Sequence, residues 1–359
     1  MPQFRMQIKP SSKALTGVGM AALLIAICVS ASVAAGQSSS PSPAASAPQT
    51  TPPWAYPLMV PEAPGAQSAP PDDETAPRHV PGTDAIYTLK QIHDGFNIVD
   101  WHPDEHAAMP AIVAHGRKPE TRGCAMCHLP NGQGRPESGS LAGLPAAYIV
   151  EQVADFRSGA RKSAEPRVLP PTLMVGVAKD VNDAEVEAAA QYFASIAYKP
   201  WIRVIESPTA PKVHLAGGLL VPVEPRVIEP LGQRIIEVPE DPERTALHDS
   251  HSGFIAYVPV GSIKRGEVLV TMGGAKVVAG KIVAGKTIQC AICHGPELKG
   301  LGNVPRIAGN SPSYTFRQLY DFRQGARTGP GAELMKASVA NLTDEDLLSI
   351  VAYLASRTP

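Results

Sequence analysis

Two pentapeptides hold the residues of this sequence that are best suited to chemistry, namely Cys124-Ala-Met-Cys127-His128 and Cys290-Ala-Ile-Cys293-His294. A Cys-x-x-Cys-His sequence is the attachment signature of haem c, in which two thiolates bind the porphyrin and the histidine ligates the iron. A structural zinc site made from the four thiolates would leave both histidines unused. A thioredoxin-like dithiol would need a pattern of strand and helix around it that we do not find. We therefore predict two covalently attached haem c groups.

The sequence around the second motif repeats the sequence around the first. At the spacing of the two motifs, Leu141–Tyr148 aligns with Ile307–Tyr314, and Gln152–Arg161 aligns with Gln318–Arg327, without a gap. The first copy then carries five extra residues before the register resumes. Similarity over such a stretch indicates two copies of one domain.

The repeat also places a methionine at the same position in each copy, Met174 and Met335. A thioether is a soft, uncharged ligand, and a His/Met pair raises the reduction potential of haem iron. After His294 the chain has no histidine and no other methionine, whereas in the first copy Met272 also follows the motif but falls outside the repeat register. Methionine more commonly serves as core filler. We predict that these two methionines are the sixth iron ligands, so that the metal ligands are His128, Met174, His294 and Met335.

Each copy, with its Cys-x-x-Cys-His motif, Ala-Gly, Phe-Arg-x-Gly and a methionine before a terminal helix, resembles a class I cytochrome c domain. The tandem resembles the dihaem cytochrome c4 group over about residues 110–199 and 260–359. The resemblance implies a mainly α fold of two tandem cytochrome c domains, and the composition of the segment between them predicts a long, Pro-rich and partly β connector. The sequence departs from the group in this connector and in its extended N-terminal tract.

The beginning of the chain is typical of an exported protein. Residues 1–35 have a basic start and a long apolar run, which indicates a signal peptide cleaved near Ala35 or an uncleaved N-terminal anchor. A lipoprotein modified at Cys28 is less favoured, because the bulky Ile27 precedes that cysteine. Residues 36–81 are rich in Pro, Ser and Ala, so we expect a disordered linker in which Trp54 and Tyr56 are partly exposed.

We expect the first cytochrome c domain over residues 82–199, the extended connector over 200–258 and the second domain over 259–359. Asn182 and Thr343 each begin a capped, amphipathic terminal helix. We expect a cytochrome helix over 263–270, and the Val, Gly and Lys residues of 276–284 predict an inserted hairpin. Extended segments or a small sheet are expected in the connector.

Other polar residues carry weaker signals. His102, His106 and His115 have no defensible metal-ligand spacing, so we expect surface or hydrogen-bonding histidines. Asp249, Ser250 and His251 are adjacent in sequence, but a catalytic triad is recognised by geometry. The repeated arginines leave two readings open, a pairing with haem propionates or an exposed helical charge. They are Arg157, Arg161, Arg323 and Arg327.

These features favour a dihaem c-type cytochrome that transfers electrons between periplasmic or membrane redox partners and is not an enzyme. Two alternatives remain, an electron-accepting subunit of a dehydrogenase complex and a dihaem peroxidase, which would need an iron without its sixth ligand. The expected partners are a redox protein donor and acceptor, such as a membrane respiratory complex or a dehydrogenase. The formal charge of −1 gives no support to nucleic-acid binding.

Overall fold

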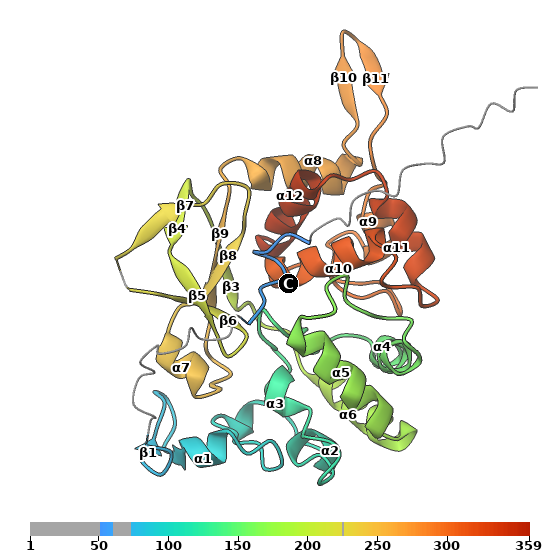
Figure 1. Ribbon diagram of the computed structural model, residues 1–359. Helices are drawn as coiled ribbons and strands as arrows, with labels where there is room; N and C mark the ends of the chain where they lie inside the picture. The colour runs from blue at the N-terminus through green and yellow to red at the C-terminus, as the bar shows by residue number, and fades with distance from the viewer. Residues whose placement is uncertain (1–50, 60–72, 225) are drawn as a thin grey trace, which may run out of the picture. The chain divides into compact units, whose positions relative to one another are not determined.

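The computed structural model describes residues 51–59, 73–224 and 226–359 (Figure 1). The chain divides into two units, Met1–Gln49 and Thr50–Pro359, and the described residues all belong to the second. The predicted signal or anchor segment of residues 1–35 and a large part of the 36–81 linker lie outside the described residues. Within the described ranges, no helix has the length and apolar character needed to span a bilayer.

The sequence repeat appears as the same succession of four helices. In the first copy these are α3 (Ala125–His128), α4 (Ala146–Ser158), α5 (Leu169–Asp180) and α6 (Asp183–Ser195). In the second they are α9 (Ala291–His294), α10 (Pro312–Arg323), α11 (Ala332–Val339) and α12 (Asp344–Ala355). Each copy encloses its own cluster of buried apolar side chains.

Both terminal helices begin with the predicted capping box. The Asn182 side chain accepts a hydrogen bond from the Glu185 backbone N–H, and the Glu185 carboxylate accepts from the backbone of Asn182 in return. Thr343 and Asp346 form the same pair at the start of α12. Each box satisfies two backbone donors that the first turn of a helix leaves unpaired, so these predicted helix starts are confirmed.

The segments that precede the two cysteine motifs differ. In the second copy α8 (Ser262–Met272) covers the predicted first cytochrome helix and packs on α12. Gly266 permits this approach, since a Cβ atom there would lie 1.9 Å from the Ser349 carbonyl oxygen. A hairpin of β10 (Lys276–Val278) and β11 (Lys281–Val283) follows, as predicted (Figure 1). In the first copy the corresponding stretch holds only the four-residue α2 (Ala111–Ala114), which contacts α6.

The connector contains strands, as expected from its β-branched runs. β3 (Ile202–Glu206) pairs in parallel with β9 (Phe254–Val258), and β8 (Ile236–Pro239) pairs antiparallel with the other edge of β9. Two antiparallel ribbons join β4 (Thr209–Pro211) to β7 (Ile228–Pro230) and β5 (Val213–Ala216) to β6 (Leu219–Pro222). The short helix α7 (Pro242–Ala246) lies between β8 and β9.

The stretch before the first copy forms a small separate core. It contains the strand pair β1 (Pro77–Arg78) and β2 (Tyr87–Thr88), the helix α1 (Leu89–Ile92) and the 3-10 turn η1 (Pro103–Glu105). Trp101 is 2% exposed, and its indole N–H donates to the Leu247 carbonyl oxygen at 2.8 Å. This contact fastens the end of α7 to the region that precedes the first haem motif.

The expectation for the aromatic residues of the N-terminal linker is wrong for Tyr56. This side chain is only 2% exposed and belongs to the buried core of the second copy. Its hydroxyl donates to Asp321 Oδ1 at 2.7 Å, and the Trp54 ring lies 4.6 Å from the Phe316 ring. Residues 51–59 therefore pack on α10. The ring contact of Trp54 and the hydrogen bond from Tyr56 to a buried carboxylate hold this segment on the helix, although the surrounding sequence is rich in proline.

Candidate haem-binding sites

Each Cys-x-x-Cys-His motif forms a single helical turn, α3 or α9, with its first cysteine half-buried and its second exposed. Cys124 packs against the core of the first copy, and Cys290 against the core of the second. None of these four described cysteines forms a disulfide, so all four sulfur atoms are available to bond a porphyrin. The turn thus presents two thiols at the edge of an apolar core. A porphyrin bonded to these thiols could bury its ring against the core.

The two motif histidines are oriented in the same way. Nδ1 of His128 lies 2.7 Å from the Gly139 carbonyl oxygen, and Nδ1 of His294 lies 2.7 Å from the Pro305 carbonyl oxygen. Because a carbonyl can only accept a hydrogen bond, Nδ1 carries the hydrogen and Nε2 keeps its lone pair. Desolvation by the surrounding protein lowers the pKa of both imidazoles. Each motif therefore offers a neutral, directed nitrogen, which is the donor that a haem iron requires.

Sequence reasoning missed the two carbonyl groups that orient these histidines. Gly139 and Pro305 each lie 11 residues after their histidine and occupy equivalent positions in the repeat. The repeat register could have pointed to the pair of positions, but a backbone acceptor imposes no residue type. Its contribution is visible only in the folded chain.

Each predicted methionine lies in the copy that it was assigned to. Met174 is on α5 and packs against the same core as Cys124, and Met335 is on α11 and packs against the same core as Cys290. Met272 lies on α8 and is 50% exposed. Met109 also packs against the first core. It therefore serves as the natural control for Met174.

The four repeated arginines divide into two pairs. Arg157 donates to the Ala178 and Val181 carbonyl oxygens at 2.8 and 2.9 Å, at the end of α5. Arg323 donates to the Leu342 carbonyl oxygen at 2.6 Å, just before α12. These two side chains fasten the turn that leads into the terminal helix, so neither of the two readings that the sequence left open describes them.

Arg161 and Arg327 instead meet where the two copies touch. They are 8% and 6% exposed, and their backbones form an antiparallel bridge. Arg161 donates to the side-chain oxygens of Gln152 and Gln318 at 2.9 and 2.8 Å. Arg327 donates to the same two oxygens at 2.6 and 3.1 Å. Each guanidinium group thus bonds a glutamine from both copies.

This arginine pair places two buried guanidinium groups in the contact region, where their charges also act on the carboxyl groups of Asp155 and Asp321. Both guanidinium groups are buried against neutral amides, and Arg161 also donates to the Tyr314 hydroxyl at 3.0 Å. Burial by itself raises the pKa of Tyr314, but the charges of Arg161 and Arg327 outweigh it and the pKa is lowered. Buried cations favour anionic partners. A haem propionate is a partner of this kind, and the propionate reading of Arg161 and Arg327 stays a prediction.

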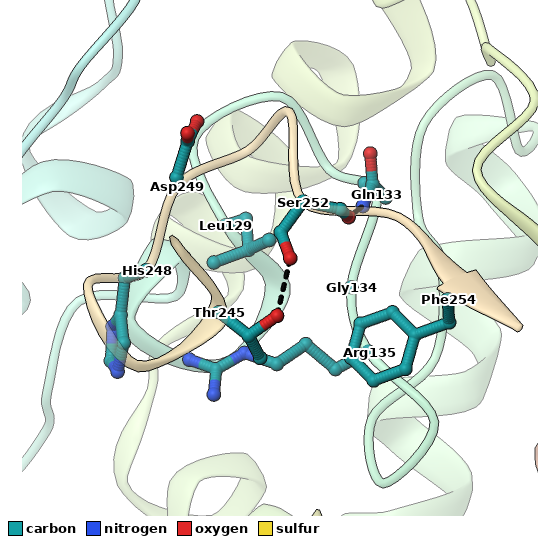
Figure 2. A pocket seen from close by; sticks show the side chains of 9 residues that line it. All are labelled: Leu129, Gln133, Gly134, Arg135, Thr245, His248, Asp249, Ser252 and Phe254. Carbon is teal, nitrogen blue, oxygen red and sulfur yellow. Dashed lines mark hydrogen bonds between the residues drawn. The ribbon is translucent and has the colours of Figure 1, made fainter. Parts of the chain in front are cut away.

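A small hollow lies beside the first motif, between the loop that follows His128 and the connector (Figure 2). Thr245 and Ser252 hydrogen-bond to each other across it, and the ring of Phe254 and the side chain of Arg135 line its wall. Burial lowers the pKa of the neighbouring His248 well below its ordinary value. Side chains fill this space, so it offers no room for a substrate.

Comparison with known proteins identifies the class. The cytochrome c family model matches residues 113–197 and 277–358. A cytochrome c-554(548) from Halomonas halodenitrificans is 37% identical over 82 residues, which are 22% of this chain and 99% of that protein. The chain belongs to the cytochrome c family.

Two relatives match across both copies. A thiosulfate dehydrogenase electron acceptor from Thiomonas intermedia (strain K12) is 27% identical over 254 residues, or 70% of this chain and 85% of the relative. Cytochrome c4 from Azotobacter vinelandii is 25% identical over 259 residues, or 69% and 90%. The chain is thus a dihaem, cytochrome c4-like electron-transfer protein with two covalently bound haem c groups. This confirms the predicted tandem fold and its cofactors.

Proposed function

We propose that this chain is a periplasmic electron carrier in which a histidine and a methionine of its own ligate each haem iron. The residues that would hold the haems are Cys124, Cys127, His128 and Met174 in the first copy and Cys290, Cys293, His294 and Met335 in the second. The observation that carries the proposal is the matched pair of histidines, each with Nδ1 held by a carbonyl at 2.7 Å. When bound, each haem supplies a one-electron ferric/ferrous couple.

Each group of protein side chains around a haem has a separate role. The two cysteines bind the porphyrin covalently, so the cofactor stays attached in both oxidation states. The fixed Nδ1–H bond prevents the imidazole from rotating and makes Nε2 a better donor. The thioether favours the ferrous state. Arg161 and Arg327 would neutralise propionate charge where the two copies meet, which would limit repulsion between the haems.

The same ligand set is the reason for proposing a carrier rather than an enzyme. With a histidine and a methionine on each iron, neither metal keeps an open position for peroxide or for a small inorganic substrate. The dihaem peroxidase alternative requires the loss of one methionine ligand. The packing of Met174 and Met335 against the cores that also contact Cys124 and Cys290 supports methionine ligation in both copies.

We further propose that the electron donor is a dehydrogenase. The similarity to electron acceptors of thiosulfate dehydrogenase supports this choice and makes such an enzyme the first donor to test. We also propose how the chain is organised. Residues 1–35 direct export or anchor the protein, 36–81 form a tether, 82–199 and 259–359 are the two cytochrome domains, and 200–258 connect them.

The ligand assignment is tested by replacing one methionine at a time. In Met174→Ala and Met335→Ala, one of the two haems should become high-spin, its potential should fall, and it should bind cyanide. The far-red absorption band that reports methionine sulfur on ferric iron should lose half of its intensity. Met109→Ala and Met272→Ala should keep the full band. A full band in Met174→Ala, or a halved band in Met109→Ala, would contradict the assignment for the first copy.

A second experiment separates the carrier from the peroxidase alternative. The wild-type protein, with both haems oxidised or with one reduced, is mixed with hydrogen peroxide and with cyanide. A carrier should show no spectral change and no turnover, and it should accept electrons from a reduced dehydrogenase in rapid mixing. Peroxide turnover by the unmodified protein would refute full ligation of both irons.

A further inference from the structure

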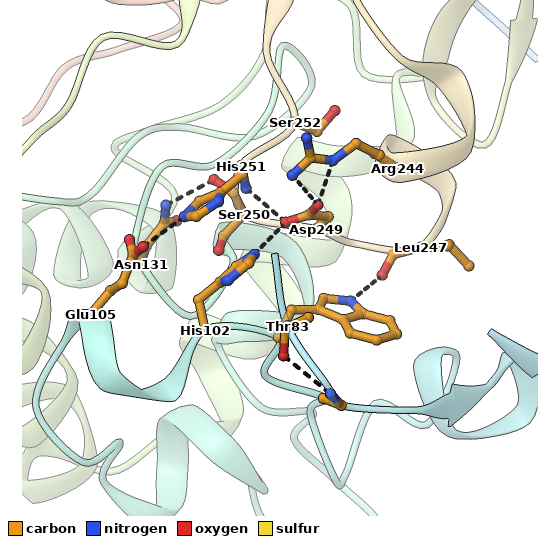
Figure 3. A network of polar contacts seen from close by, with 12 residues as sticks. Thr83, His102, Glu105, Asn131, Arg244, Leu247, Asp249, Ser250, His251 and Ser252 are labelled. Carbon is orange, nitrogen blue, oxygen red and sulfur yellow. Dashed lines mark hydrogen bonds and ion pairs between the residues drawn. The ribbon is translucent and has the colours of Figure 1, made fainter. Parts of the chain in front are cut away.

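A second group of potential metal ligands lies outside the haem sites (Figure 3). His102 directly precedes the 3-10 turn η1, and Glu105 is its last residue. Since side chains three residues apart eclipse on such a turn, the two project from the same side. His251 comes from the loop after α7, far along the chain. One potential ligand atom from each of the three side chains lies within 4.8 Å of the other two.

A buried carboxylate orients this group. Asp249 has a side chain with no exposed surface, and its Oδ1 accepts from Nε2 of His102 at 2.9 Å. The same oxygen accepts from the backbone N–H of His251 at 2.9 Å, and Arg244 holds Oδ2 at 2.6 Å. Histidines that ligate metals usually donate their other ring N–H to a carboxylate, which fixes the ring and its tautomer. His102 already has such a partner.

We propose that His102, Glu105 and His251 form a binding site for one divalent transition-metal ion, with Zn²⁺ as the best match. Two imidazoles and one carboxylate are a donor set that Zn²⁺ uses in proteins, with a fourth position left for water. In this arrangement Asp249 is a positioning residue that acts through His102. Neither the comparisons nor the haem chemistry assigns a role to these residues.

The proposal requires a small rearrangement of exposed side chains. The rings of His102 and His251 are stacked, with centroids 3.6 Å apart and planes 10° from parallel, and parallel rings cannot both direct a lone pair at one ion. Ligand atoms around a tetrahedral zinc ion are about 3.4 Å apart. His251 must therefore turn out of the stack. Its side chain and that of Glu105 are 38% and 35% exposed, so both can move.

Two contacts would be replaced when the ion binds. Nε2 of His251 now lies 2.9 Å from Glu105 Oε1, and the ion would take the place of the hydrogen between them. The ammonium group of Lys199 lies 3.0 Å from Glu105 Oε2, where it competes with a cation. The Lys199 side chain is 67% exposed, and an ion pair in such a position stabilises the fold little.

Metal binding would also stiffen the surroundings of the first haem site. The carbonyl oxygens of Ser250 and Ser252 accept from the side chains of Asn131 and Gln133 at 3.1 and 2.9 Å. Those two residues lie in the loop that directly follows His128. An ion that joins His251 to η1 would therefore hold the connector against this loop.

The test uses the haem-loaded protein after chelator treatment, titrated with Zn²⁺ in a calorimeter and by equilibrium dialysis with metal analysis. We expect one zinc ion per chain. His251→Gln and Glu105→Gln should each weaken binding at least about tenfold, whereas His115→Gln, at an exposed histidine outside the cluster, should leave it unchanged. Lys199→Ala should tighten binding, because it removes the competing cation. Both ligand variants lie at the surface, so an unchanged haem content confirms that they fold.

A second measurement reports the tie between the connector and η1. Zn²⁺ should raise the unfolding temperature of the wild-type protein and slow amide exchange in residues 249–252, and it should do neither in His251→Gln. Three results would each overturn the proposal. They are no zinc binding at 100 µM metal, equal binding by His251→Gln and wild type, and binding that His115→Gln abolishes.

Discussion

The contact between Tyr56 and Asp321 supports a quantitative prediction about the N-terminal tether. The Tyr56 hydroxyl donates to Asp321 Oδ1 at 2.7 Å, and the backbone N–H of Ala164 donates to the same oxygen at 2.8 Å. Burial raises the pKa of both Tyr56 and Asp321, which shows how little water reaches this pair. Tyr56→Phe keeps the ring and removes only the hydroxyl, whose short hydrogen bond goes to Asp321 Oδ1 and whose longer contact, at 3.3 Å, goes to the Arg317 carbonyl oxygen.

The expected loss follows from the burial of the carboxylate. A hydrogen bond to a charged group contributes about 1.5–3 kcal/mol to the free energy of unfolding. A buried acceptor that loses a donor also destabilises the fold, because water does not replace the lost hydrogen bond. Asp321 Oδ1 keeps the Ala164 N–H, which places the loss near the middle of that range, at about 2 kcal/mol. Residues Thr50–Pro359 form one compact unit, which is larger than the 150–250 residues for which such a loss lowers the unfolding temperature by about 4–8 °C, so we expect a fall at the lower end of that range.

The assay is urea and thermal unfolding of the haem-loaded protein, followed by circular dichroism. Tyr257→Phe is the control, because this half-buried tyrosine has no hydrogen-bond partner for its hydroxyl among the described residues. The control should change the free energy of unfolding by less than about 0.5 kcal/mol. An equally small change in Tyr56→Phe would refute the argument that residues 51–59 are fastened to α10 through this bond.

Two further changes test packing and charge. Gly266→Ala should destabilise the protein by about 3 kcal/mol, because its Cβ would lie 1.9 Å from the Ser349 carbonyl oxygen. Gly176→Ala, in the exposed part of α5, should instead stabilise it by about 0.5–1 kcal/mol. Equal melting curves for these two variants would contradict the α8–α12 contact. The Arg167 side chain lowers the pKa of Glu165 to about 2, so the stability from this pair is present above the ordinary value and is lost as the pH falls from about 4.5 towards 2. Glu165→Gln should therefore flatten the acid limb of the stability profile, and an unchanged slope in acid titrations followed by circular dichroism would argue against the pair.

Much of the fold could be predicted because its signals are local. The capping boxes at Asn182 and Thr343, the helix over 263–270 and the hairpin of 276–284 each depend on residues within one or two turns of the chain. The cytochrome c family model, which matches both copies, confirmed the tandem organisation. The assignment of Met174 and Met335 also came from the repeat, and it stays a prediction until the ligand variants are measured.

The sequence by itself determined the candidate residues for haem attachment, because the attachment motif is short and the repeat shows it twice. Only the tertiary structure decided how those residues are supported. It separated Arg161 and Arg327, which meet between the copies, from Arg157 and Arg323, which fasten helix ends, although all four share one sequence pattern. It also brought His251 to His102 and Tyr56 to Asp321. Such contacts join positions far apart in the chain, and no local pattern of residue types encodes which distant partner a side chain will meet.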